Sequence, residues 1–146
     1  MQVTSLDQLK NIKINDIVEL PAFSDGTPFV AELKKPNMLM LMAGGHIPNT
    51  LLNVAMDIFQ HGKGKETINK ALNNPKDLKV LTELLIVLAK ACLVNPSFKQ
   101  LEDLGIELNE NQLSAILTYA QGGVVALESF RQQQANSESS EPSEQV

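Results

Sequence analysis

The chain has 146 residues and a formal net charge of −5, from 12 basic and 17 acidic side chains. This length favours a single domain. Apolar residues make up 43% of the chain, but aromatic residues only 4%, and tryptophan is absent. A core built mainly from aliphatic and methionine side chains suits packed helices. The acidic balance argues against a protein that binds nucleic acid, which needs a lysine and arginine surface opposite the phosphates.

The features of secreted and membrane proteins are also missing. Cys92 is the only cysteine, which excludes an intramolecular disulfide and a metal site built from thiolates. The first ten residues contain no basic segment followed by an apolar core, so they do not resemble a signal peptide. The longest apolar stretches, such as Leu84–Ala89, are too short to span a bilayer. We expect a soluble intracellular protein without a membrane partner.

Two short runs near the start of the chain have the composition of β-strands. They are Asp16–Leu20 (DIVEL) and Phe29–Leu33 (FVAEL). Between them, Asp25 and Gly26 give a turn signal flanked by prolines. The sequence therefore predicts a small β-hairpin at about residues 16–33, which must pack onto helices because two strands are barely stable alone.

Two pairs of residues have the spacing of a helix capping box. Ser5 and Gln8 predict a helix of one or two turns near the start of the chain. Asn109 and Gln112 precede a helical apolar pattern near its end. That pattern is interrupted by a Gly-Gly pair, so we expect one bent helix, or two helices with a tight joint, ending near Gln133.

From Pro36 onward every signal in the sequence is helical. A helix is expected to begin at Pro48 and to keep one apolar face, formed by Leu51, Leu52, Ala55, Met56 and Phe59, before Gly62 stops it. The strongest helix is expected over Lys76–Val94, with a wide apolar stripe. Its stripe consists of Val80, Leu81, Leu84, Leu85, Val87, Leu88, Ala91, Cys92 and Val94, and the opposite, polar face consists of Lys79, Thr82, Glu83 and Lys90. Short helices are expected at 66–72 and 97–104.

These elements predict a mainly α fold, a compact helical bundle with a small N-terminal β-hairpin. A single helical domain should cover residues 1–134. Residues 135–146 (ANSESSEPSEQV) are acidic and almost without apolar side chains. Such a segment cannot offset the entropy lost on ordering, so we expect a disordered acidic C-terminal tail.

The segment from Lys34 to Leu52 contains five consecutive large apolar residues between a proline and two glycines. On a helix, five such residues cannot share one face. We expect the five residues to form two groups on different faces, separated by about 100° or more around the helix axis. The first group is Met38, Leu41 and Met42, and the second is Leu39 and Met40. Flexible thioether side chains suit adaptable binding surfaces. Either this helix is buried on nearly all sides, or part of it binds a partner, and all five residues are candidates for that surface.

No combination of residues suggests catalysis. His46 lies in a turn, and His61 is expected at the end of a helix, where a cation suits the dipole. Glu102 and Asp103 are neighbours on a short helix and point in different directions, which makes them a poor acid–base pair. The glycine pairs follow no strand and fit no phosphate-binding motif. We therefore expect no enzymatic activity, no cofactor and no metal.

Two segments of the chain resemble a known family. They are ELPAFSDGTPFVAELKKPNMLMLMAGGHIPNTLL and ELNENQLSAILTYAQGGVVALESFR. In their order and spacing they look like the tail assembly chaperones of tailed bacteriophages and prophages of Gram-positive bacteria. With the middle helix, the resemblance covers about Asp16 to Arg131. Ala22 and His46 depart from the pattern, where a second proline and a basic residue are expected.

The resemblance implies a non-enzymatic function in virion assembly. Such proteins bind the tape measure protein in the host cell cytoplasm and assist assembly of the tail tube around it. It also implies recruitment of the tail tube protein, self-association along the tape measure, and absence from the mature virion. In many such phages a ribosomal frameshift makes a second, longer product. Two other readings stay open: a small structural tail or head completion protein, and a helical regulator that binds nucleic acid, which the acidic charge disfavours.

Overall fold

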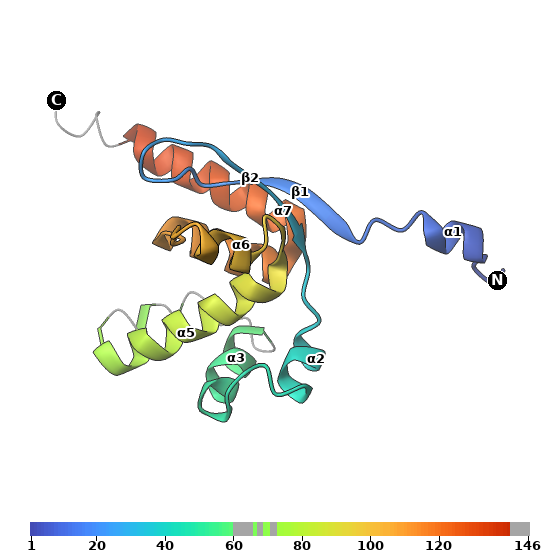
Figure 1. Cartoon of the computed structure of the whole chain (residues 1–146), viewed down its shortest axis with the longest axis horizontal. Coiled ribbons are helices and arrows are strands. Elements are labelled where there is room, and N and C mark those ends of the chain that lie inside the picture. The colour runs from blue at the N-terminus through green and yellow to red at the C-terminus, as the bar shows by residue number, and fades with distance from the viewer. Residues whose placement is uncertain (60–65, 67–68, 71–72, 141–146) are drawn as a thin grey trace.

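A computed structural model describes residues 1–59, 66, 69–70 and 73–140 of the chain. Within them the protein is mainly helical and has one small three-stranded antiparallel sheet in the order β1-β2-β3 (Figure 1). The helices are α1 (Leu6–Lys10), α2 (Met38–Ala43), the 3₁₀ turn η1 (Asn49–Leu51), α3 (Leu52–Phe59), α5 (Pro75–Cys92), α6 (Phe98–Asp103) and α7 (Glu110–Ser140). The strands are β1 (Asn15–Leu20), β2 (Phe29–Lys34) and β3 (Leu93–Asn95).

The predicted hairpin is confirmed and is one residue longer at each outer end. β1 and β2 pair antiparallel, with Asn15 opposite Lys34 and Leu20 opposite Phe29. The loop closes at the predicted turn, where the Thr27 amide donates a 2.9 Å hydrogen bond to the Asp25 carboxylate. Gly26 adopts a φ of +88°, a conformation that residues with a side chain rarely reach.

The third strand was not predicted, and the expectation that the long helix continues through Val94 is wrong. α5 ends at Cys92, and Leu93 turns to an extended backbone with φ −73° and ψ 118°. Leu93 then pairs with Leu33 on the edge of β2 that β1 leaves free. Two causes combine here: Asn95 precedes a proline, which disfavours helix, and β2 offers unpaired backbone groups.

The other helix predictions hold in part. α5 begins at Pro75, and its fully buried positions are Leu81, Leu84, Leu88, Ala89 and Cys92. In the helix before it, Met56 was expected in the core but is exposed, and Ile58 is buried instead. The inward face runs through Leu51, Ala55 and Ile58, the ordinary i, i+4, i+7 spacing of a helix, so Ile58 lies within the buried face and Met56 falls outside it. The side chain of Phe59, the stop at Gly62 and most of the helix expected at 66–72 lie outside the described residues.

α7 bends sharply at Gly123, where φ is +73° and ψ is −156°. This matches the bend expected at the Gly-Gly pair. The expected end near Gln133 is wrong, because the helix continues to Ser140. No glycine or proline occurs between Gln133 and Pro142 to stop it. Residues 135–140, expected to be disordered, therefore extend the helix, and residues 141–146 lie outside the described part of the chain.

The buried apolar side chains form two clusters. The first lies among the sheet, the C-terminal end of α5, α6 and α7. The second lies among α2, η1, α3 and the earlier part of α5. Two helices contribute to both: α5 through Leu88 and Ala89, and α7 through Ile116 and Leu117. These two helices therefore hold the two halves of the molecule together.

Polar contacts attach the start of α7 to the hairpin. Asn109 and Gln112 form the predicted capping pair. The Gln112 backbone amide donates to the Asn109 side chain at 2.9 Å, and the Asn109 backbone amide donates to the Gln112 side chain at 3.0 Å. Gln112 is fully buried and also donates to the Pro21 carbonyl at 3.0 Å, while Asn109 donates to the Ala22 carbonyl at 3.3 Å. One pair of side chains thus begins the helix and fixes it against the end of β1.

A second attachment lies two turns further along α7. The Tyr119 side chain is fully buried, and its hydroxyl lies 2.7 Å from the Asp16 carboxylate and 3.3 Å from the Leu33 carbonyl. Burial, and then the hydrogen bond to Asp16, raise the pKa of Tyr119 well above its ordinary value. The phenol therefore stays protonated and donates to the hairpin throughout the physiological range.

Replacing Gln112 by alanine should lower the free energy of unfolding by about 2–4 kcal/mol. The variant loses the side-chain acceptor of the Asn109 amide, a hydrogen bond worth about 1 kcal/mol, and a buried hydrogen bond to Pro21, whose carbonyl is left without its partner at a cost of about 1–3 kcal/mol. Urea unfolding followed by circular dichroism measures the change.

Gln100 supplies a matched control, because it closes the same kind of capping box on Ser97 at the exposed start of α6. Gln100→Ala should cost only about 0.5–1 kcal/mol. If the two variants lost equal stability, the contact between Gln112 and the hairpin would contribute nothing.

Candidate functional site

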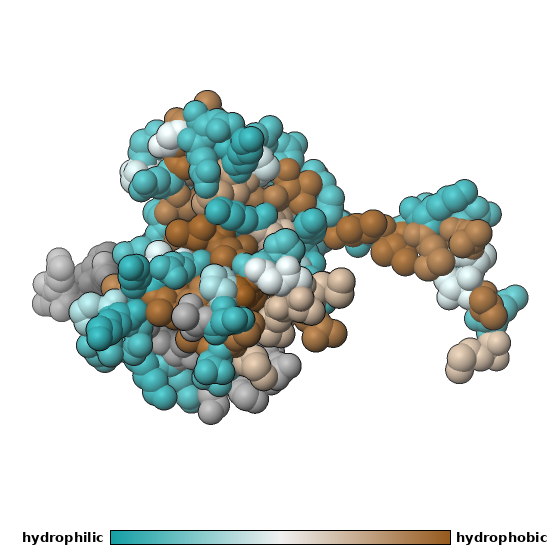
Figure 2. Space-filling view, turned by 60° about the horizontal axis from the view of Figure 1, so that its bottom comes forward, coloured by the Kyte–Doolittle hydropathy of each residue, from teal (hydrophilic) through white to brown (hydrophobic). Residues whose placement is uncertain are grey.

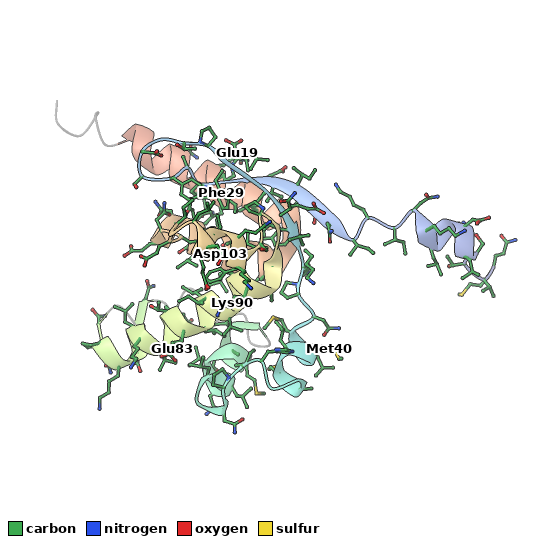
Figure 3. All side chains as sticks on the ribbon, viewed as in Figure 1. Glu19, Phe29, Met40, Glu83, Lys90 and Asp103 are labelled. Atoms are coloured by element: carbon green, nitrogen blue, oxygen red, sulfur yellow. The ribbon has the colours of Figure 1, made fainter. Side chains whose placement is uncertain are left out.

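The five apolar residues of α2 divide between two faces as the helical spacing predicts. Met38, Leu41 and Met42 are half-buried and pack against the second core cluster. Leu39 and Met40 point away from it and are 69% and 64% exposed. α2 is therefore part of the core on one side and an open apolar surface on the other (Figure 3).

Both ends of this short helix are fixed by local interactions. The Asn37 side chain accepts a hydrogen bond from the Met40 amide at 3.1 Å and caps the N-terminus. Gly44 caps the C-terminus, and its amide donates to the Met40 carbonyl at 2.8 Å. A Cβ at Gly44 would lie only 2.9 Å from that carbonyl oxygen, so the close approach requires glycine. Three residues after Gly44, the buried side chain of Ile47 anchors the chain in the core.

A cleft of about 610 Å³ lies between α2 and α5. Met40 and Leu41 line one wall, and Val87 and Ala91 of α5 line the other. The remaining lining residues are Lys34, Pro36, Asn37, Gly44, His46 and Lys90. Figure 2 looks toward this side of the molecule, where apolar surface is visible over α2. The exposed face of α2 is therefore continuous with a hollow whose walls are largely apolar.

The two lysines give the cleft a positive rim in an otherwise acidic protein. Lys34 comes from the end of β2, and Lys90 from the last turn of α5. The Lys90 ammonium lies 5.4 Å from the centre of the Phe98 ring, a distance at which the ring attracts the cation. An apolar hollow with cations at its edge suits an amphipathic helix that carries apolar anchors and an acidic residue.

The other candidate residues of the sequence do not come together. His46 is exposed and lines the cleft, whereas Glu102 and Asp103 are exposed on α6. Cys92 is buried, and desolvation raises the pKa of its thiol to about 12, so it remains a protonated, unreactive side chain. Among the described residues, no group of three or more His, Cys, Asp or Glu side chains could hold a metal ion. His61 lies outside them.

None of the helices in the described part of the chain combines the length and the apolar character needed to cross a bilayer. Comparisons with protein families, with curated proteins and with solved structures found no match for this chain.

Sequence reasoning identified α2 but missed the wall of the cleft on α5. Lys90 was placed on the polar face of that helix, and it is indeed exposed there. Its position beside α2 depends on the packing of segments about fifty residues apart, for which the sequence carries no local signal.

Asp substitutions along α2 should separate the exposed face from the buried one. Met40→Asp should change the free energy of unfolding by less than about 0.5 kcal/mol, because the side chain is exposed and an acid suits the first turn of a helix. Leu41→Asp, one residue further, should cost about 1–3 kcal/mol because it places a carboxylate against the core. Thermal and urea unfolding test both. Similar losses for the two variants would mean that Met40 belongs to the core.

Proposed function

We propose that this protein is a tail assembly chaperone of a tailed bacteriophage or prophage of Gram-positive bacteria. In this role it binds the tape measure protein without catalysis and assists assembly of the tail tube. The observation that carries the proposal is the exposure of Leu39 and Met40 beside an apolar cleft, on a helix whose other face is fixed in the core. The resemblance of the two long sequence segments to this family supports it.

The physical chemistry of the surface fits a long helical partner. A tape measure protein is mostly helical and presents repeated apolar stripes, which can enter a groove lined by methionine and leucine. Full burial of Leu39 and Met40 contributes about 1.5–3 kcal/mol for each side chain. One such contact gives weak binding by itself, but many copies on one filament bind strongly through avidity.

The remaining features of the proposal follow from this role. We place the protein in the host cell cytoplasm and outside the mature virion, with the tail tube protein as a second partner and with copies associating along the tape measure. We also propose that its helices form one compact bundle, because α5 and α7 each contribute to both core clusters.

Met40→Asp should abolish co-purification with the tape measure protein of the same phage genome, while its circular dichroism spectrum stays helical. The introduced carboxylate cannot be buried against an apolar partner. Met56→Asp is the matched control, because Met56 is also an exposed methionine but lies on α3, outside the residues that line the cleft. Retained binding by Met40→Asp, or equal loss in both variants, would contradict the assignment of the surface.

Mass spectrometry of purified virions distinguishes the proposal from a structural role. A chaperone should be absent from the particles but present in lysates of induced or infected cells. A tail or head completion protein should instead be found in every particle. Detection at a constant ratio to the tube subunit would replace the chaperone proposal by the structural one.

A further inference from the structure

The first fourteen residues form an arm that projects from the body of the protein (Figures 1 and 2). Every one of these residues is exposed, and α1 buries none of its side chains. The arm is nonetheless rich in large apolar residues, with exposures from 46% to 92%. These are Val3, Leu6, Leu9, Ile12 and Ile14. Leu6 and Leu9 lie three positions apart and so share one face of α1. Within the described part of the chain, these apolar side chains of the arm pack against no other element.

A second exposed apolar feature, which we name the ledge, lies where α6 ends. It consists of Leu104, which is 75% exposed, and Ile106, which is 37% exposed. Gly105 between them has a φ of +74°, and the Ile106 amide donates to the Leu101 carbonyl at 2.9 Å. This closing turn of the helix holds the two side chains in fixed positions.

The ledge and the arm have opposite charge. Lys99 is the only base among residues 99–110, and four exposed acidic side chains lie within four positions of the ledge in the sequence. The acids are Glu102, Asp103, Glu107 and Glu110. The arm contains Lys10, Lys13 and Asp7, a side-chain charge of +1, so the rest of the chain carries −6. Lys10 and Lys13 lie 3.6 Å from Asp7 and Asp16, and both lysine side chains are at least 75% exposed, whereas the Asp16 side chain is 26% exposed. Such pairs contribute little and exchange readily.

The arm and the ledge lie at opposite ends of β1. The arm joins β1 at Asn15. The segment after the ledge is attached beyond the other end of the strand, where Asn109 and Gln112 bond to the carbonyls of Ala22 and Pro21. Six strand residues separate these ends by about 20 Å. Because the arm also projects away from the body, it points away from the ledge of its own chain, and a second copy can offer a ledge on the side that it faces.

We propose that the arm of one copy binds the ledge of a second copy. Leu6 and Leu9 contact Leu104 and Ile106, and the arm lysines face the acidic rim. Complete burial of the five apolar arm residues removes roughly 300–600 Å² of surface, and about twice that when the receiving surface is included. This total reaches only the lower limit of stable interfaces, so self-association should be weak and concentration-dependent.

The interface joins two different surfaces, so it is head-to-tail. An assembly of two or more copies therefore has a free arm at one end and a free ledge at the other. It can grow as a row or close into a ring. This inference stands without the proposed function, because it concerns the purified chain alone.

The first test is sedimentation velocity of the full chain over a range of micromolar concentrations. The wild type should form species larger than a dimer, and their fraction should fall as salt is raised, because the charges contribute to the contact. A monomer at all concentrations would overturn the proposal.

Two variants then test the surfaces separately: Leu6→Glu with Leu9→Glu on the arm, and Leu104→Lys with Glu107→Lys on the ledge. All four positions are exposed, so folding should be unchanged by circular dichroism. Each variant alone should associate on the order of 100-fold more weakly than the wild type. A 1:1 mixture should form a heterodimer and nothing longer, because one intact arm meets one intact ledge.

Leu78→Glu is the control, because Leu78 is an exposed leucine on α5 outside both surfaces, and it should associate as the wild type does. Undiminished association of either double variant, or a mixture that contains only monomers, would overturn the proposal.

Discussion

The attachment of α7 to the hairpin is the constraint on which the rest of the structure depends. A two-stranded hairpin is barely stable alone, and α7 supports it at two points: Gln112 reaches the Pro21 carbonyl, and Tyr119 reaches Asp16 and Leu33. β3 completes the sheet on the other side of β2. Only three residues separate the end of β2 from α2, so the position of the hairpin determines where α2 and its exposed face lie. Loss of the attachment between α7 and the hairpin would therefore disturb the cleft, although the residues that form the attachment do not line the cleft.

Much of the local structure could be predicted because its causes lie within a few residues. The capping pairs, the turn at Asp25 and Gly26, and the bend near Gly123 each follow from one residue type at one position. The predictions that are wrong depend on contacts between segments that are distant in the sequence. β3 exists because β2 has a free edge, and a helical apolar pattern cannot show that edge. Met56 lies at the edge of the apolar arc of its helix, and the packing against the core decides that the other edge, with Ile58, is buried.

The same distinction applies to the candidate site. The division of the five apolar residues of α2 into two groups on different faces follows from helical spacing alone, so the two groups could be separated in advance. Which group would be exposed depended on where the core lies. The opposite wall of the cleft depended on packing between α2 and α5, and its lysine had been placed on a solvated face. The arm and the ledge were missed for a related reason: apolar residues in the sequence are expected to be buried, and only the structure shows those that are not.

The two proposed surfaces are compatible in space. The root of the arm, Asn15, lies opposite Lys34 in the hairpin, and Lys34 lines the cleft beside α2. The ledge lies near the other end of β1. When the arm of one copy binds the ledge of the next, none of the residues that line the cleft takes part in the contact. A row of copies would then present one cleft per subunit at regular intervals. Regular spacing of weak sites is the arrangement from which a long helical partner with repeated apolar stripes gains most by avidity.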